Sequence, residues 1–290
     1  MIVCPSCGHE SRLTTPRLDP ALQSLFGYAV SQLQLSILLS LLCVATLAIA
    51  GWRPYAEEFR ERLPQIVAAF LLVGILAVAV FYPVTSFGKA EEIDPETIWF
   101  PSLLFGHGIL SAFLFLWWRL RRDVAFAAFL HLSWGGWWDK IRHGVATGCG
   151  GWVVTVMATG AAAGLFGLTG RLSAPTEAPP LILWLAELPI LYRLMIVGVA
   201  MTVEEAFFRG FLQPRFGLLV SSILFALSHF SYGLPLMIVG VFTISLIIGR
   251  TFERERDLLP CIIAHGIFDG VQLLIVLPWV VHTWSPAGPL

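Results

Sequence analysis

The sequence predicts an all-α protein, a polytopic transmembrane helical bundle of about eight helices. Of its 290 residues, 57% are hydrophobic and 13% are charged, whereas charged residues make up about 25% of a typical soluble domain. A helix that crosses a bilayer needs about 20 apolar residues, so eight such helices would use roughly 160 positions. This number is close to the hydrophobic content of the chain, which excludes an ordinary soluble globular domain.

The charge balance also excludes one class of partner. The chain has 18 Lys and Arg residues against 19 Asp and Glu residues, and its formal net charge is −1. Such a chain lacks a basic surface on which nucleic acid could release counterions. No nucleic acid is therefore expected as a partner, and the lipid bilayer is.

Apolar runs bounded by charged residues, Pro or Gly divide the chain into a polar N-terminal tail, residues 1–30, and a transmembrane domain, residues 31–290. The expected spans are residues 32–51, 64–83, 101–118, 145–169, 190–212, 218–233, 235–250 and 258–282. The segment 119–143 has basic ends and three tryptophans. This composition favours a helix that lies in the headgroup layer.

Small and basic residues predict how the spans pack and how they are oriented. Gly160, Gly164 and Gly167 have the spacing that lets another membrane helix approach closely. Most Lys and Arg residues fall in loops that eight spans would place on one side of the membrane, namely 52–63, 119–143, 213–217 and 250–257. Cytoplasmic loops carry an excess of Lys and Arg. We therefore expect a multi-pass protein of the cell membrane whose basic loops are cytoplasmic and whose termini lie outside.

The fifth span contains three charged residues, Glu204, Glu205 and Arg209. A charge at the centre of a membrane helix costs on the order of 2.5–3.5 kcal/mol, so each of them needs a partner or a function. Glu205 and Arg209 are four residues apart and can pair on one face. Glu204 lies about 100° around the helix from Glu205. It must therefore face a cavity or a polar group of another helix.

Candidate partners for Glu204 occur in two later spans. His229 lies in the sixth span, and His265 lies one turn before Asp269 in the eighth. At a rise of 1.5 Å per residue, Glu204 and both histidines lie at a similar depth, roughly 12–18 Å from the basic side. These residues predict an intramembrane site that opens towards the cytoplasm. The other histidines, His107, His131, His143 and His282, are interpreted as interfacial or packing residues.

A cluster of carboxylates and imidazoles can hold a divalent ion and a water molecule, or it can activate water directly by general base catalysis. Both alternatives predict hydrolysis. A transporter or proton relay is the rival, because intramembrane carboxylates and histidines also line such paths. Secondary transporters have inverted repeats with broken helices, and no repeat is apparent in the sequence.

Three motifs occur in order, Glu-Glu-x-x-x-Arg at 204–209, Phe-x-x-x-His at 225–229 and His-x-x-x-Asp at 265–269. In this order and spacing, and in membrane helices, they resemble the CAAX protease and bacteriocin-processing (CPBP, or Abi) family of intramembrane metalloproteases. The resemblance covers about residues 190–275, the expected catalytic core. It implies an enzyme, an intramembrane endopeptidase that hydrolyses a peptide bond.

The resemblance also implies roles for the motif residues. Glu204 would activate the attacking water, with Glu205 beside it and Arg209 anchoring the pair. His229 and His265 would either bind a metal ion or polarise the water and the tetrahedral oxyanion. A zinc ion held by Glu204, His229 and His265 and a metal-free glutamate mechanism both stay open.

Asp269 stands where the family often has Asn. An ionised Asp can only accept hydrogen bonds, so Asp269 would donate to an oxyanion only if it were protonated. Otherwise it would orient His265 or ligate the ion. Phe225 is interpreted as a packing residue.

The expected substrate is a peptide or a prenylated protein, as the resemblance implies. The alternative is a non-catalytic peptide-binding or bacteriocin-immunity membrane protein of the same family. In the tail, Cys4 and Cys7 have the spacing of half a zinc knuckle, and no second pair with this spacing follows. A structural zinc in the tail and a degenerate knuckle both stay open.

Overall fold

The computed structural model describes residues 2–3, 10–11, 20–49, 51, 58–86, 100–169, 180–232 and 234–284. This part of the chain is almost entirely helical, which confirms the predicted all-α class; two strands of two residues each, β1 (Ile2–Val3) and β2 (Glu10–Ser11), pair antiparallel near the N-terminus. The helices are α1 (Pro20–Ile49), α3 (Arg62–Leu76), α4 (Tyr82–Thr85), α5 (Phe100–Arg121), α6 (Phe126–Phe129), α7 (Trp137–Leu168), α8 (Pro180–Glu187), α9 (Ile190–Met195), α10 (Met201–Glu205), α11 (Gln213–Ser228), α12 (Pro235–Glu255), α13 (Leu259–Val271) and α14 (Leu277–Trp284). Shorter π-helical turns are η1 (Ala77–Phe81), η4 (Ile196–Ala200), η5 (Ala206–Leu212) and η7 (Gln272–Val276), and η6 (Phe230–Tyr232) is a 3₁₀ turn.

The described residues contain six stretches that are long and apolar enough to cross a membrane, where about eight were predicted. They are Tyr28–Ile49, Arg62–Thr85, Trp137–Leu168, Ile190–Ser228, Pro235–Glu255 and Leu259–Val281. The third predicted span, 101–118, lies in α5, which is not among the six and carries Arg119 and Arg121 in its last turn. The fifth and sixth predicted spans lie together in Ile190–Ser228.

Gly217 divides the stretch Ile190–Ser228 into two antiparallel helices. Its φ of 82° and ψ of 169° are not helical, and glycine adopts such positive φ values at little cost. Beyond it, the Ser221 hydroxyl donates a hydrogen bond of 2.7 Å to the carbonyl of Phe208. The rings of Phe208 and Phe225 meet edge to face, with centroids 4.9 Å apart. The chain therefore turns back at Gly217, and the first two motifs lie side by side.

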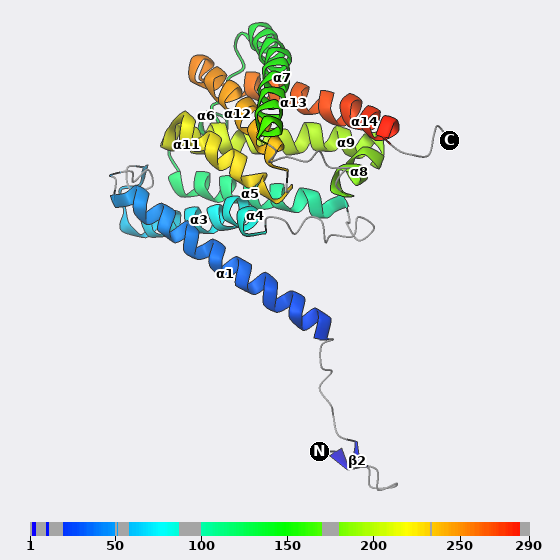
Figure 1. Cartoon of the computed structure of the whole chain (residues 1–290). Helices are drawn as coiled ribbons and strands as arrows, with labels where there is room; N and C mark the ends of the chain where they lie inside the picture. The colour runs from blue at the N-terminus through cyan, green and yellow to red at the C-terminus, as the bar shows by residue number, and fades with distance from the viewer. Residues whose placement is uncertain are drawn as a thin grey trace.

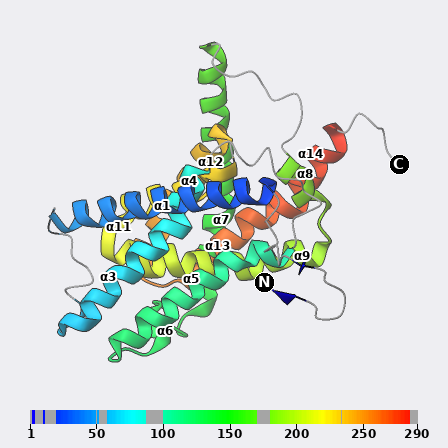
Figure 2. The ribbon, with the colours of Figure 1, turned by 90° about the horizontal axis from the view of Figure 1, so that it is seen from below.

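α7 crosses α12 and α13 and packs closely on both (Figures 1 and 2). Gly144, Gly148 and Gly151 form the buried face of α7. A Cβ atom added to Gly148 would lie 2.8 Å from the backbone oxygen of Ala264 in α13. The absence of side chains at these glycines lets the helix backbones approach each other, as in other membrane bundles.

Two predictions about this region are wrong. The glycines predicted to pack, Gly160, Gly164 and Gly167, have nothing within 4 Å of their Cβ positions, and Figure 2 shows this end of α7 projecting beyond the other helices. Segment 119–143 is not one interfacial helix. It contains the end of α5, the single turn α6 and the start of α7 at Trp137, because this stretch has to connect two helices that each extend into it.

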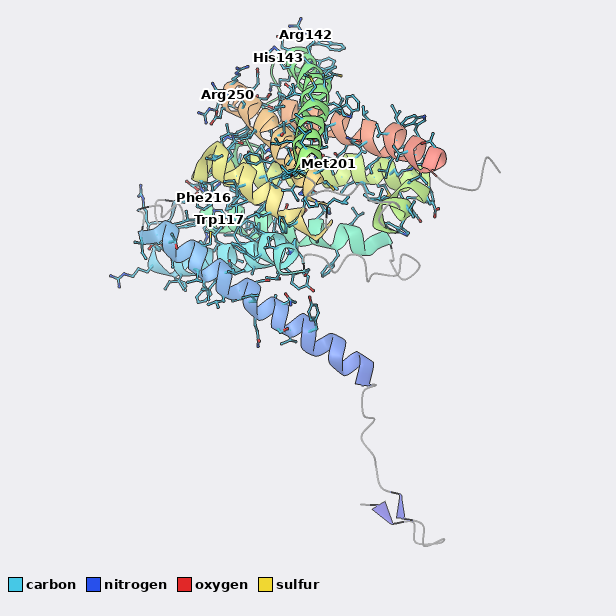
Figure 3. All side chains as sticks on the ribbon, in the orientation of Figure 1. Trp117, Arg142, His143, Met201, Phe216 and Arg250 are labelled. Carbon is cyan, nitrogen blue, oxygen red and sulfur yellow. The ribbon has the colours of Figure 1, made fainter. Side chains whose placement is uncertain are left out.

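The described parts of the loops predicted to share one side are linked by ion pairs; in Figure 3, Arg142 and Arg250 of these loops are labelled at the top and upper left. Arg215, next to the Gly217 turn, contacts both carboxylate oxygens of Glu58 at 2.6 and 2.8 Å. Arg121, at the end of α5, lies 3.6 Å from the same carboxylate. Lys140 in α7 lies 2.8 Å from Asp257, between α12 and α13. These ion pairs link the described parts of the four basic loops to one another, and their cytoplasmic location stays a prediction.

A cluster of aromatic side chains joins α5 to η5, which continues from the helix that carries Glu204. The ring of Phe211 in η5 meets Phe113 at 4.9 Å and Trp117 at 4.8 Å, both edge to face. Phe207 also contacts Phe113, at 5.7 Å. All four side chains are buried. Burial of an aromatic side chain contributes roughly 1.5–3 kcal/mol, so this cluster fixes α5 against the helix that carries Glu204.

Candidate functional site

Glu204 and Glu205 lie in α10, between two π-helical turns of one helical rod that runs from Ile190 to Phe216. Met201, one turn earlier, is buried and lies near the centre of the bundle in Figure 3. π-Helical turns inserted in an α-helix occur frequently at functional sites. Here two such turns flank the paired glutamates.

Glu204 lies between histidines from two other helices. Its Oε1 accepts a hydrogen bond of 2.9 Å from Nε2 of His107 in α5. Its Oε2 lies 4.0 Å from Nε2 of His229 at the end of α11. The side chain of Glu204 is 12% exposed, and within the described part of the chain Oε2 is buried and has no hydrogen-bond partner. Glu204 thus faces polar groups of other helices, as predicted. Its Oε2 could accept a further hydrogen bond.

The hydrogen bonds of His229 fix which ring nitrogen faces Glu204. Nδ1 lies 2.8 Å from the carbonyl oxygen of Phe225 and 3.1 Å from the Ser228 hydroxyl, which itself donates to the same carbonyl. A carbonyl oxygen can only accept, so Nδ1 carries a proton. In the neutral ring Nε2 is then an acceptor, and it points towards Glu204 Oε2.

Glu205 belongs to a separate buried group. Its side chain is fully buried, and its Oε2 lies 3.2 Å from Nε of Arg209, which is 1% exposed. This ion pair confirms the predicted pairing at i, i+4. Glu205 Oε1 accepts a hydrogen bond of 2.7 Å from Nδ1 of His265 in α13. Arg209 also donates to the hydroxyl of Ser245 in α12 at 3.2 Å.

Phe225 holds this group together. The guanidinium of Arg209 lies 4.5 Å from its ring centroid, within the range of a cation–π contact. The rings of His229 and His265 lie 4.7 and 5.6 Å away. Phe225 packs as predicted, and it contacts one charged and two imidazole side chains of the motifs.

His265 directs both ring nitrogens towards carboxylates. Besides Nδ1 on Glu205, Nε2 lies 3.5 Å from Oδ2 of Asp269, one turn further along α13. His265 is 4% exposed and Asp269 is 24% exposed. Asp269 therefore contacts His265, which agrees with the orienting role left open above.

The predicted zinc ligands Glu204, His229 and His265 lie in two separate contacts. Within the described ranges no group of three or more His, Cys, Asp or Glu side chains is placed to hold a metal ion. Glu204 and His229 face each other, whereas His265 turns its nitrogens to Glu205 and Asp269. Cys4 and Cys7, the candidate ligands of a separate zinc in the tail, lie outside the described residues.

The sequence interpretation of His107 as an interfacial or packing residue is wrong, because His107 hydrogen-bonds to Glu204. His107 is 97 residues from Glu204 in the chain, and neither its neighbours nor its spacing indicate a site. The one available signal is that a polar ring stands in an apolar run. Of the other histidines, His131 packs on Phe252 and His143 pairs with Glu255, while the side chain of His282 is outside the described part.

Comparison with known proteins concerns the C-terminal part of the chain. Residues 186–271 match the family model of the Rce1-like type II CAAX prenyl endopeptidases. An uncharacterized protein of Bacillus subtilis, YpbD, is 35% identical over 83 residues, which are 28% of this chain and 42% of that relative. The chain therefore matches less than half the length of this relative. No solved structure matches the chain.

The matched range contains all three motifs, with Glu204, Glu205 and Arg209 in the first, His229 in the second and His265 and Asp269 in the third. The resemblance inferred from those motifs is thus confirmed. The six stretches that are long and apolar enough to cross a membrane, together with this similarity, support an integral membrane protein. Residues 186–271 are thus similar to the Rce1-like type II CAAX prenyl endopeptidases.

Proposed function

We propose that the protein is an intramembrane endopeptidase that hydrolyses a peptide bond with water activated by Glu204. The observation that carries this proposal is the pair of acceptors formed by Glu204 Oε2 and His229 Nε2, 4.0 Å apart, with Oε2 buried and lacking a hydrogen-bond partner among the described residues. A separation of 4.0 Å exceeds a direct hydrogen bond. It is close enough for one water molecule to bridge both atoms.

Such a water would donate one hydrogen to Glu204 and the other to His229, because both atoms are acceptors. Its lone pair would then be free to attack the carbonyl carbon of the scissile bond. In the attack the water oxygen forms the new bond to carbon and one proton passes to Glu204. Collapse of the tetrahedral intermediate breaks the carbon–nitrogen bond, and Glu204 returns the proton to the leaving amine. Water is consumed, and Glu204 ends in its starting state.

His265 and Asp269 supply a donor for the tetrahedral oxyanion. Nδ1 of His265 already donates to Glu205. His265 Nε2 lies 3.5 Å from Asp269 Oδ2, and a close contact between these two acceptors is favourable only if one of them carries a proton. Either group can present that proton to the oxyanion. Loss of one oxyanion donor typically costs about 10²–10³ in rate.

The buried ion pair of Glu205 and Arg209 holds the site together. Glu205 fixes the ring of His265 through Nδ1, and Arg209 balances the charge of Glu205. Neither side chain reaches the surface. We assign both a positioning role, through His265, and assign proton transfer to Glu204.

The proposed substrate is a peptide or prenylated protein that reaches the site from within or beside the bilayer. The groups around Glu204 are partly exposed, His107 by 20% and His229 by 18%, which supports access to the acceptor pair. We place the protein in the cell membrane, with the site open to the cytoplasm, because of the basic loops, which ion pairs link to one another. No step in this mechanism uses a metal ion, since among the residues that the structure describes no three His, Cys, Asp or Glu side chains are placed to hold one.

The test is cleavage by the purified protein in phospholipid nanodiscs. A panel of fluorogenic peptides, prenylated and unprenylated, is offered to the wild type and to Glu204→Gln, with products identified by mass spectrometry. The expected result is cleavage of at least one peptide by the wild type and a loss of about 10³-fold or more in Glu204→Gln, because an amide cannot accept the proton of water. Addition of a zinc chelator should leave the rate unchanged.

The matched control is Glu253→Gln, which makes the same chemical change at a residue that pairs with Arg250 on α12. It should cleave like the wild type. Equal cleavage by Glu204→Gln would remove Glu204 as the base. Tight binding of peptides without cleavage across the whole panel would instead favour the non-catalytic binding or immunity protein.

A further inference from the structure

We propose that His107 is a positioning residue of the site, which holds the carboxylate of Glu204 so that Oε2 faces His229 and the attacking water. This inference deepens the proposed hydrolysis and rests on it. It brings α5, which lies outside residues 186–271, into the site.

The contact itself is direct and partly buried. Nε2 of His107 donates to Oε1 of Glu204 at 2.9 Å, with the two side chains 20% and 12% exposed. A carboxylate has two oxygens in a fixed plane. A donor on Oε1 therefore limits rotation of the group and determines where Oε2 points, which is towards His229 at 4.0 Å.

The position of His107 is set by packing rather than by the hydrogen bond alone. Leu110 and Leu114, three and seven residues later on α5, are both buried. Further along α5, Phe113 contacts Phe207 and Phe211 of the rod that carries Glu204. The donor and the carboxylate thus belong to two helices that are already fixed against each other. Such preorganisation matters, since a misplacement of about 1 Å can cost 10²-fold in rate.

The first measurement is the split between kcat and KM for peptide cleavage. The amide nitrogen of Gln can occupy the place of Nε2, whereas the shorter Asn cannot reach it. We expect His107→Asn to lower kcat about 10–100-fold with KM changed less than about threefold. His107→Gln should recover most of that loss. His143→Asn is the control, because His143, near the start of α7, pairs with Glu255 at the end of α12, and it should match the wild type.

The second measurement needs no activity. Thermal unfolding midpoints are compared for His107→Asn, Glu204→Leu and the double variant. Because the two residues are in contact, the shift of the double variant should be smaller than the sum of the two single shifts. This cycle also separates a loss of folded protein from a loss of rate.

The outcomes are distinguishable. Additive shifts, or equal kcat values for His107→Asn and wild type, would overturn the role of His107 while leaving the proposed peptidase intact. Equal losses in His107→Gln and His107→Asn would also overturn it, because a donor at Nε2 would then not matter. A wild type that cleaves nothing would refute the proposed function and, with it, the positioning role, while a non-additive cycle would still establish the contact.

Discussion

Substitution of Arg209 by Met should destabilise the protein strongly. Arg209 is 1% exposed and pairs with fully buried Glu205 at 3.2 Å. It also donates to Ser245 and lies over the ring of Phe225. Met has a similar length but no charge, so the variant leaves Glu205 buried without its arginine.

Removing one partner of a buried ion pair costs about 3–5 kcal/mol. For a chain of this size, 1 kcal/mol corresponds to roughly 2–4 °C in the unfolding midpoint, which gives a shift of about 6–20 °C. The assay is thermal unfolding in nanodiscs, with the double variant Glu205→Leu/Arg209→Met as the partner experiment. Since the double variant buries no unpaired charge, it should recover part of the loss. An Arg209→Met protein as stable as the wild type, or a double variant less stable than the single one, would show that Arg209 does not compensate the buried charge of Glu205.

Three further predictions concern packing, pH and the third motif. Gly148→Ala should destabilise the protein by about 1–3 kcal/mol, because its Cβ would lie 2.8 Å from a backbone oxygen of α13; Gly150→Ala, with nothing within 4 Å, should be neutral or slightly stabilising in the same unfolding assay. Burial raises the pKa of Asp257, but hydrogen bonds from Lys140 and other donors outweigh it, so the net pKa is below the usual value. A carboxyl group whose pKa is lowered in the folded state stabilises the protein fully above its unfolded pKa of about 3.9, and this stabilisation is lost as the pH falls below that value. The thermal unfolding midpoint of the wild type should therefore fall more steeply below about pH 4 than that of Asp257→Asn. Parallel plots of midpoint against pH for the two proteins would contradict this. Asp269→Asn should keep cleavage within about tenfold of the wild type because an amide can still donate to an oxyanion, whereas Asp269→Leu should lose about 10²-fold or more.

Several features of the helix that carries Glu204, Glu205 and Arg209 could be predicted from residues close together in the sequence. The pairing of Glu205 with Arg209 follows from a spacing of four residues, and the orientation of Glu204 away from that pair follows from its angle on the helix. The fold-back at Gly217 lies at the predicted loop 213–217, because a glycine there can take the positive φ that the turn needs. These features depend on neighbours within one or two turns.

Features that depend on distant segments could not be predicted in this way. The contact of His107 with Glu204 depends on how α5 packs. Helix α5 packs through aromatic contacts such as Phe113 with Phe211, and the sequence does not indicate which helix such a ring will contact. Helical rise predicts His265 at the depth of Glu204, yet the ring of His265 turns to Glu205 and Asp269. Helical rise gives the depth of a residue but not its rotation towards a neighbour.

The central claim is that Glu204 and His229 hold the attacking water between them. The most direct measurement is an experimental structure in a lipid environment at a resolution that shows ordered solvent. We expect solvent density about 2.7–3.2 Å from both Glu204 Oε2 and His229 Nε2. A structure in which these two side chains face lipid, or bond directly with no solvent between them, would contradict it.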